Sequence, residues 1–172
     1  MDDLLRGLRE EGRADHPGAF TVDAGGAMAR LGRYATADPD RYVLHGVEAA
    51  ALGGATRVDV DRPWSGTVVR FDGAPLGPQD LRELMPGLLA GRWGTGDRRH
   101  ALALAVLLAL SGGGRAVEVR SHQGGQRVRG RFTVAGLEVD EAVHPAPPGV
   151  EVRVGLRRGL AGWTLGLPET PI

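Results

Sequence analysis

The chain has 172 residues, with 21 acidic and 21 basic side chains, and therefore no formal net charge. This length fits one domain with its own core, and the charge balance disfavours nucleic acid and anionic membranes as partners. The sequence contains no cysteine, which excludes disulfides, thiolate nucleophiles and cysteine-based zinc sites.

Every basic residue is an arginine, and the sequence contains neither lysine nor asparagine. A Schiff base, a P-loop lysine and any site that needs an asparagine amide are therefore excluded. The N-terminus lacks the basic-then-apolar layout of a signal peptide. The longest apolar run, residues 101–110, falls short of the roughly 20 residues that cross a bilayer. We expect a cytoplasmic protein that does not enter membranes.

Composition divides the chain into three parts. A polar, amphipathic lead-in covers residues 1–19, with a short helix expected over 2–11, and a tail rich in proline and glycine covers 160–172. Residues 20–159 between them show the apolar periodicity of one folded domain.

The first part of this domain is predicted to be mainly helical. After a short strand over 19–23, apolar residues at helical spacing predict a helix over 27–34. Another helix is expected to begin at Asp38 and Pro39, because aspartate caps helices and proline suits the first helical position. Glycines 53–54 should end it.

A hairpin and a second helical stretch follow. Residues 56–61 and 67–71 alternate apolar and polar side chains around a turn, as paired strands do. Pro78 should open a helix that ends near Gly91, because apolar side chains recur there every three or four residues.

The last part combines one apolar helix with a group of strands. A glycine-rich loop over 91–96 leads to Asp97, which should cap a helix through Leu110; that helix is apolar all round and should be buried. Helices followed by strands predict an α+β, two-layer sandwich, with helices on one face of a mixed, mostly antiparallel sheet. The late strands are expected over 116–121, 127–134, 137–143 and 150–156.

This order of elements resembles the GHKL, or Bergerat, ATP-binding fold over roughly residues 20–156. The stretch DPDRYVLHGVEAAALGGATRVDVD is similar to the helix and strand that carry Glu-x-x-x-Asn in heat-shock chaperone ATPases. The stretch TVVRFDGAPLGPQDLRELM is similar to the strand, Asp-Gly turn and helix of their adenine-binding box, and PPGVEVRV resembles a late strand. The resemblance implies an ATP-binding domain of the heat-shock chaperone type.

The catalytic positions of that family are substituted in this chain. The family's glutamate activates water and its asparagine holds magnesium, and the matching positions are His45 and Ala49. Glu48 is one residue from Ala49, about 100° around the helix. His45 and Glu48 are therefore the remaining catalytic candidates, although His45 also fits a partly exposed helix histidine without a role. No metal site is expected.

The nucleotide-binding positions are better preserved. Asp72 matches the family's adenine-binding aspartate, and Gly73 follows it directly, which breaks the family's Asp-x-Gly-x-Gly spacing; Asp-Gly is also an ordinary turn. Gly94, Thr95 and Gly96 precede a helix N-terminus, whose N–H groups and dipole suit phosphate; the alternative is a plain loop or lid. ATP is the expected cofactor.

Other groupings of side chains predict surfaces rather than chemistry. The five histidines are scattered, and none of the three serines lies in a Gly-x-Ser-x-Gly elbow. Trp64 and Trp93 lie in expected loops and are candidate contacts for a protein partner. The outer face of the late sheet is expected to be a solvated face that carries Arg120, Arg127, Arg129, Arg131 and Arg153, while Glu118, Asp140, Glu141 and Glu151 fall on the same strands.

The hypothesis from sequence is a degenerate GHKL-like domain that binds nucleotide weakly without efficient hydrolysis. It would act as a chaperone-like or regulatory interaction module with a protein partner. Two alternatives remain open, an active ATPase with substituted residues and an interaction scaffold that needs no nucleotide.

Overall fold

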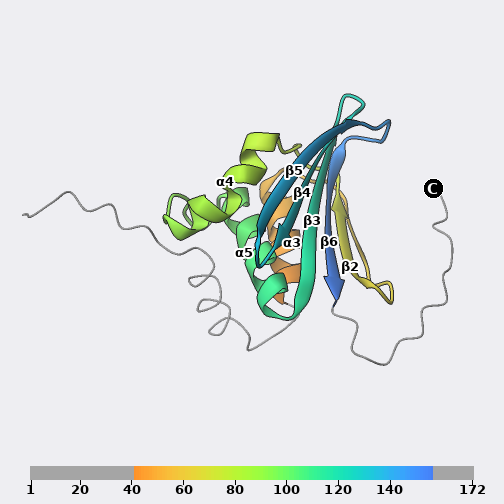
Figure 1. The fold of residues 1–172 in the computed structure, drawn as a ribbon. Helices are drawn as coiled ribbons and strands as arrows, with labels where there is room; N and C mark the ends of the chain where they lie inside the picture. The colour runs from red at the N-terminus through yellow and green to blue at the C-terminus, as the bar shows by residue number, and fades with distance from the viewer. Residues whose placement is uncertain (1–40, 157–172) are drawn as a thin grey trace, which may run out of the picture.

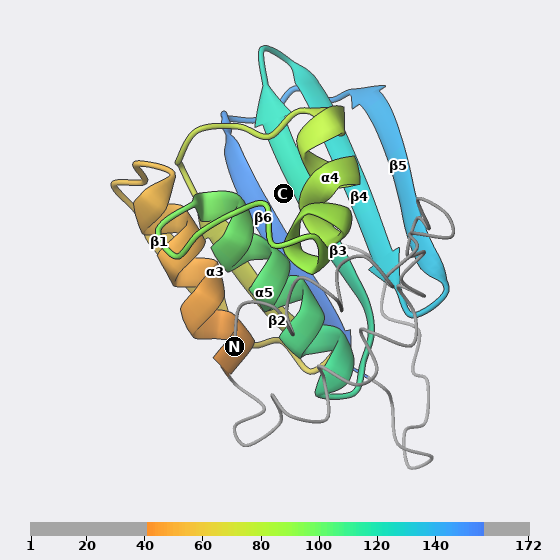
Figure 2. The ribbon, with the colours of Figure 1, turned by 90° about the vertical axis from the view of Figure 1, so that its left-hand side faces the viewer.

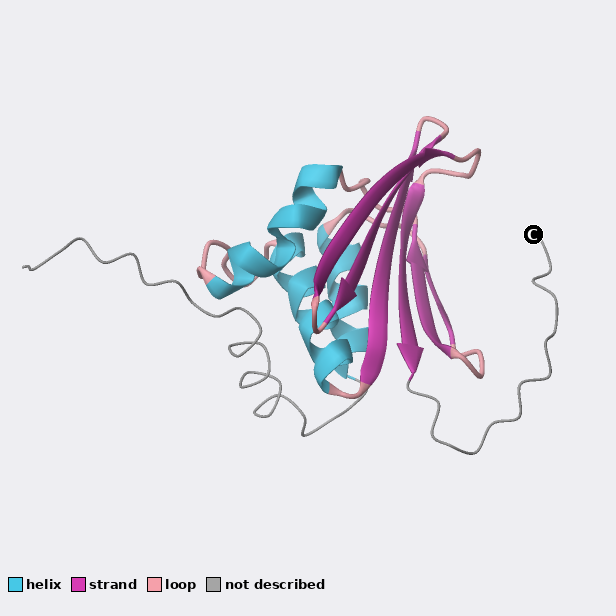
Figure 3. Cartoon of the chain, in the orientation of Figure 1, coloured by secondary structure: helices cyan, strands magenta, loops and turns pink. Residues whose placement is uncertain are grey.

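The computed structural model describes residues 41–156, which form three helices and six strands in two layers. The helices lie against one face of the sheet, and no other described element covers the opposite face (Figures 1 and 3). The two-layer α+β class is thus confirmed. The expectations for 2–11, 19–23, 27–34, Asp38-Pro39 and 160–172 lie outside the described residues.

The three helices match the predicted ones, and their described ends agree with the prediction, while the predicted start of the first helix lies outside the described residues. They are α3 (Arg41–Leu52), α4 (Pro78–Leu89) and α5 (Arg98–Ser111). Asp97 caps α5 as predicted, because its carboxylate accepts a hydrogen bond from the Arg99 backbone N–H at 2.8 Å. Gly54 and Gly113 follow α3 and α5 with φ of 73° and 97°, which glycine adopts without strain. All three helices are too short or too polar to traverse a bilayer.

The sheet has the order β1-β2-β6-β3-β4-β5, and all five pairings among the described strands are antiparallel. The last strand in the chain, β6, lies between β2 and β3. It therefore joins the early hairpin to the three later strands. The strands are β1 (Val58–Asp61), β2 (Gly66–Phe71), β3 (Gly114–Gln123), β4 (Gln126–Thr133), β5 (Gly136–Val143) and β6 (Gly149–Leu156).

The helix α5 occupies the middle of the helical layer, as its apolar composition predicts. It contacts α3 and α4 as well as β3, and Figure 2 shows it between those helices. Ala103 and Val106 of α5 are completely buried, and they share the core with Leu81 of α4, Val119 of β3 and Phe132 of β4. The core thus lies between the helices and one face of the sheet.

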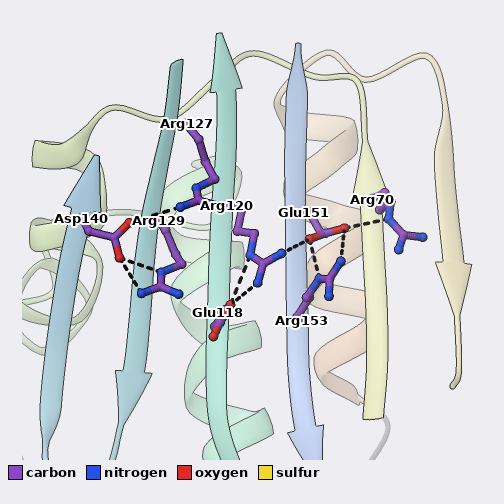
Figure 4. Close-up of polar contacts among 8 residues, drawn as sticks. All are labelled: Arg70, Glu118, Arg120, Arg127, Arg129, Asp140, Glu151 and Arg153. Carbon is purple, nitrogen blue, oxygen red and sulfur yellow. Dashed lines mark hydrogen bonds and ion pairs between the residues drawn. The ribbon is translucent and has the colours of Figure 1, made fainter. Parts of the chain in front are cut away.

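The opposite face of the sheet carries a network of ion pairs (Figure 4). Glu151 is its centre, since hydrogen bonds reach its carboxylate from Arg70 at 2.7 Å, Arg153 at 2.5 Å and Arg120 at 3.5 Å. Arg120 also binds Glu118 at 2.7 Å. The face is of mixed charge, but Glu151 at its centre is largely shielded from water, with its side chain 13% exposed.

Two adjacent acidic residues of β5, Asp140 and Glu141, lie on opposite faces of the sheet. Asp140 is on the outer face and binds Arg129 at 2.7 Å. Glu141, by contrast, is the register partner of Val128, whose side chain packs against the core. Because side chains alternate along a strand, Glu141 belongs to the helix-side face, at the exposed edge of β5.

Candidate functional site

An open hollow of about 630 Å³ lies at the N-terminus of α5. Its lining consists of the loop over 94–96 and the first residues of α5, together with Leu52 at the end of α3 and Asp80 of α4. Gly96 has a φ of 99°, a conformation that residues with a side chain rarely adopt. The hollow is thus lined by all three residues of the predicted phosphate-binding loop, Gly94, Thr95 and Gly96.

The backbone of this loop offers donors to a ligand. Among residues 41–156, the N–H groups of Thr95 and Gly96 have no hydrogen-bond acceptor in the protein. Unpaired N–H groups beside a helix N-terminus, at the positive end of its dipole, are the arrangement that favours anions such as phosphate.

Four charged residues line the hollow, two acidic (Asp80 and Asp97) and two basic (Arg98 and Arg99). Asp97 pairs with Arg99 at 3.0 Å, and the hydrogen bond from Arg99 holds the pKa of Asp97 below its usual value. The negative charge of Asp97, which would repel an anion, is thus balanced within the same turn. Arg98 also lines the hollow, but its guanidinium donates to the carbonyl oxygens of Ala74 at 2.6 Å and Pro75 at 2.8 Å.

Trp93 is a packing residue, which corrects its prediction as an exposed contact. The indole is half-buried and lies so close to α4 that a Cβ on Gly87 would be 2.3 Å from its ring. The Arg99 guanidinium is 5.4 Å from the ring centroid, within the range of cation–π attraction. Trp64, in the turn between β1 and β2, is fully exposed as predicted.

Asp72, at the end of β2, has a structural role as a hydrogen-bond acceptor for the segment that precedes β1. Its carboxylate accepts hydrogen bonds from the Thr56 hydroxyl at 2.6 Å, the Thr56 N–H at 2.8 Å and the Arg57 N–H at 3.0 Å. The bond from the Thr56 hydroxyl and those from the two N–H groups lower the pKa of Asp72 to about 2. Asp72 thereby holds the segment that enters β1 against the end of β2.

Asp72 and the glycine-rich loop line different hollows. Asp72 lines a separate hollow of about 430 Å³, with His122, Glu151 and residues 146–149, at one end of the outer sheet face. Gly73 is buried, and a Cβ there would be 3.1 Å from the Gly53 carbonyl oxygen. A contact of Asp72 with adenine remains a prediction.

His45 and Glu48 lie together on α3. The His45 Nδ1 is 2.9 Å from the Glu48 carboxylate, and the side chains are 27% and 48% exposed. Neither residue lines the hollow at α5. Ala49, at the family's asparagine position, is buried in the core. Within residues 41–156, no three histidine, aspartate or glutamate side chains gather closely enough to hold a metal ion.

Sequence reasoning missed the contacts that shape the hollow. Arg98 lines the hollow and also links α5 to the segment after β2 through its hydrogen bonds to Ala74 and Pro75. Asp80 was not considered, although its carboxylate accepts the Gly77 N–H at 2.8 Å and helps to open α4. The Arg98 contacts join residues 24 and 23 apart, so no local sequence pattern indicates them.

Comparison with known proteins gives structural similarity alone. No protein-family model and no curated protein matches the chain. Among solved structures, the N-terminal domain of a DNA repair protein has 10% identity and a TM-score of 0.53, over 78% of this chain and 42% of that one. The 43K ATPase domain of Thermus thermophilus gyrase B, solved with an aminocoumarin, has 14% identity and a TM-score of 0.51, over 69% and 33%. The gyrase B subunit of Myxococcus xanthus has 13% identity and a TM-score of 0.53, over 70% and 37%.

These neighbours establish the class of fold. Their domains are of the GHKL type, and the described helices and antiparallel sheet have the same layout, so the GHKL-like fold expected from sequence is confirmed. The neighbours do not single out the heat-shock chaperone branch. The chain spans less than half the length of each of these structures.

Proposed function

We propose that this domain binds the phosphates of a nucleotide weakly at the loop of Gly94, Thr95 and Gly96, and does not hydrolyse it efficiently. The observation that carries the proposal is the hollow at the N-terminus of α5, where two backbone N–H groups are available to an anion. The GHKL-like fold supports a nucleotide as that anion, because one similar structure is described as an ATPase domain.

The proposed lack of turnover rests on the substituted helix α3. His45 is paired with Glu48, and Ala49 is buried where the family resemblance places a magnesium-binding asparagine. A water held near the phosphates would therefore lack both a nearby base and a metal ligand from this helix. Binding without that pair would leave the nucleotide intact.

Gly94→Val is the variant that tests the phosphate site. Gly94 has no neighbouring atom within 4 Å of an added Cβ, and its φ is not positive. A valine there should therefore fold normally while its side chain fills the hollow. In calorimetric titrations with ATP, we expect the substitution to weaken binding by tenfold or more, about 1.4 kcal/mol, with Tm unchanged.

The matched controls separate the phosphate site from the other candidate contacts. Val143→Ala, on the far edge strand β5, should leave the affinity for ATP as it is. Asp72→Ala should lower Tm, because the ties to Thr56 and Arg57 are lost; a loss of affinity without a fall in Tm would instead support the adenine contact. Equal affinity of Gly94→Val and the unchanged chain would refute the proposed site.

An active ATPase is the second candidate, and one contact favours it. The imidazole of His45 is oriented by the Glu48 carboxylate at 2.9 Å, which is how a general base is commonly held. If this pair is catalytic, His45→Ala and Glu48→Gln should each reduce phosphate release tenfold or more without weakening ATP binding. We expect release at the background rate from the unchanged chain and from both variants.

The proposed role beyond nucleotide binding is that of an interaction module, of chaperone-like or regulatory type. Trp64 supports it, because its fully exposed indole projects from a turn and contributes nothing to the core. Trp64→Ala should therefore keep the stability of the domain, and a loss of its ability to delay aggregation of a heated client protein would assign that role to the indole.

A further inference from the structure

The connection between β5 and β6 brings two histidines together at one end of the outer sheet face. His122 lies near the end of β3, and His144 begins the connection over 144–148, which contains three prolines. The two ring centroids are 5.4 Å apart, and the ring planes are tilted by 47°. The His144 backbone N–H donates to the Gly125 carbonyl oxygen at 2.9 Å, which ties the start of the connection to the β3–β4 turn.

The connection and the neighbouring strands surround His122. Because it follows the buried Ser121 in β3, its side chain belongs to the outer face, where its register partner on β4 is Arg127. It lines the hollow of about 430 Å³ together with residues 146–149. Its Nδ1 atom is buried and has no hydrogen-bond partner among residues 41–156. A protonated imidazole carries N–H groups on both nitrogens, so a proton at Nδ1 would be buried without an acceptor.

The charges around His122 also disfavour its protonation. Burial lowers the pKa of His122 below its ordinary value, and the nearby charge of His144 acts in the same direction. Arg127 and Arg120 contribute likewise, whereas Glu151 opposes them. Among the described residues, no carboxylate forms an ion pair with either imidazole, and Glu151 is hydrogen-bonded to three arginines. The other charged side chains that line the hollow are Arg57, Asp59, Arg70 and Asp72, and Asp140 pairs with Arg127 at 3.8 Å.

We propose that His122 and His144 form a pH-sensitive switch, which holds the 144–148 connection on the sheet while both imidazoles are neutral and releases it in mildly acidic solution. Protonation places like charges on neighbouring rings beside Arg127. Outward movement of the connection separates these charges and gives the His122 Nδ1 atom access to water, so the released form takes up protons more readily. The closed form is therefore favoured above the ordinary histidine pKa of about 6.5, and it loses this advantage as the pH falls through the lower pKa of the closed form.

The reactivity of a cysteine placed in the connection measures its release, because the sequence contains no cysteine of its own. Ala146→Cys is the probe, since Ala146 is half-buried and lines the hollow. Val134→Cys is the reference, because Val134 lies in the β4–β5 turn and is 76% exposed. With a dithiodipyridine reagent, which modifies thiols in acid as well, the ratio of the two rates should increase about threefold or more between about pH 7.5 and about pH 5.5.

Glutamine variants show whether the two histidines cause this increase. The ratio should be the same at both pH values when His122→Gln or His144→Gln is added to the probe and reference chains, because the paired imidazoles are then lost. His45→Gln is the matched control, since His45 lies on α3 and does not line this hollow, and it should keep the full increase. A constant ratio with both histidines present, or an increase that persists in either variant, would overturn the proposal.

A titration of the unchanged chain by NMR covers the case in which a glutamine variant does not fold. We expect the pKa of His122 to lie below its ordinary value of about 6.5. The backbone amide signals of Ala146 and Gly149 should shift with the same midpoint, because the connection is released as His122 becomes charged. An ordinary pKa for His122, or amide signals that do not follow its titration, would contradict the proposed switch.

Discussion

Gly66→Ala is expected to be the most destabilising single substitution of a glycine in the described chain. A Cβ at Gly66 would be 1.8 Å from the Val154 carbonyl oxygen of β6, a backbone atom that cannot rotate away. Backbone strain of about 1–3 kcal/mol and a forced shift of similar cost, about 1–3 kcal/mol, together predict a loss of about 3 kcal/mol or more.

The loss should spread through the sheet, because Gly66 opens the β2–β6 pairing that joins the hairpin to the later strands. Urea unfolding followed by circular dichroism would measure it. Gly136→Ala is the matched control, since Gly136 has a φ of 147° against 155° for Gly66 but no atom within 4 Å of an added Cβ. Equal losses in the two variants would show that backbone conformation, and not the contact with Val154, is responsible.

Local patterns in the sequence predicted the helices and strands, but they did not predict the order of the strands in the sheet. The helices and strands followed from local signals: Pro78 and Asp97 mark helix starts, and the alternation in 150–156 marks a strand. The position of β6 between β2 and β3 did not follow. Alternation fixes which face of a strand is buried, but it does not specify which strands become neighbours.

The same contrast between local and long-range determinants applies to the candidate site. The glycine-rich loop and its helix were predictable because all their determinants lie within residues 91–97. The ties of Asp72 to Thr56, and of Arg98 to Ala74, depend on how distant segments pack together. Trp93 was assigned to the surface because it lies in a loop, yet Gly87 leaves a space on α4 that its indole fills.

The second large expected effect is a loss of stability when the ion-pair network on the outer face of the sheet is broken. Glu151→Gln is expected to lower the free energy of unfolding by about 1–3 kcal/mol, the usual cost of breaking hydrogen bonds to a charged group with little access to water. The Glu151 side chain is only 13% exposed and receives hydrogen bonds from Arg70, Arg120 and Arg153. Without its charge, three guanidinium groups face one another with less compensation.

The effect should depend on pH in a defined direction. Burial alone would raise the pKa of Glu151, but hydrogen bonds from Arg153 and Arg70 outweigh it and hold the pKa below its ordinary value. A carboxylate whose pKa is lowered by folding stabilises the protein above the unfolded pKa, about 4.3. The difference between the unchanged chain and Glu151→Gln should therefore be constant from neutral pH to about pH 5 and shrink as the pH falls through the folded pKa.

Glu138→Gln provides the matched control for this prediction. Glu138 pairs with Arg131 at 3.4 Å on the same face, but its side chain is 75% exposed. Exposed pairs contribute only about 0–1 kcal/mol, so Glu138→Gln should change stability little at any pH. A stability difference for Glu151→Gln that persists unchanged below pH 3 would contradict the assignment, because the cost would then come from packing and not from charge. The contrast between two glutamates of one sheet face would thus separate buried from exposed ion pairs.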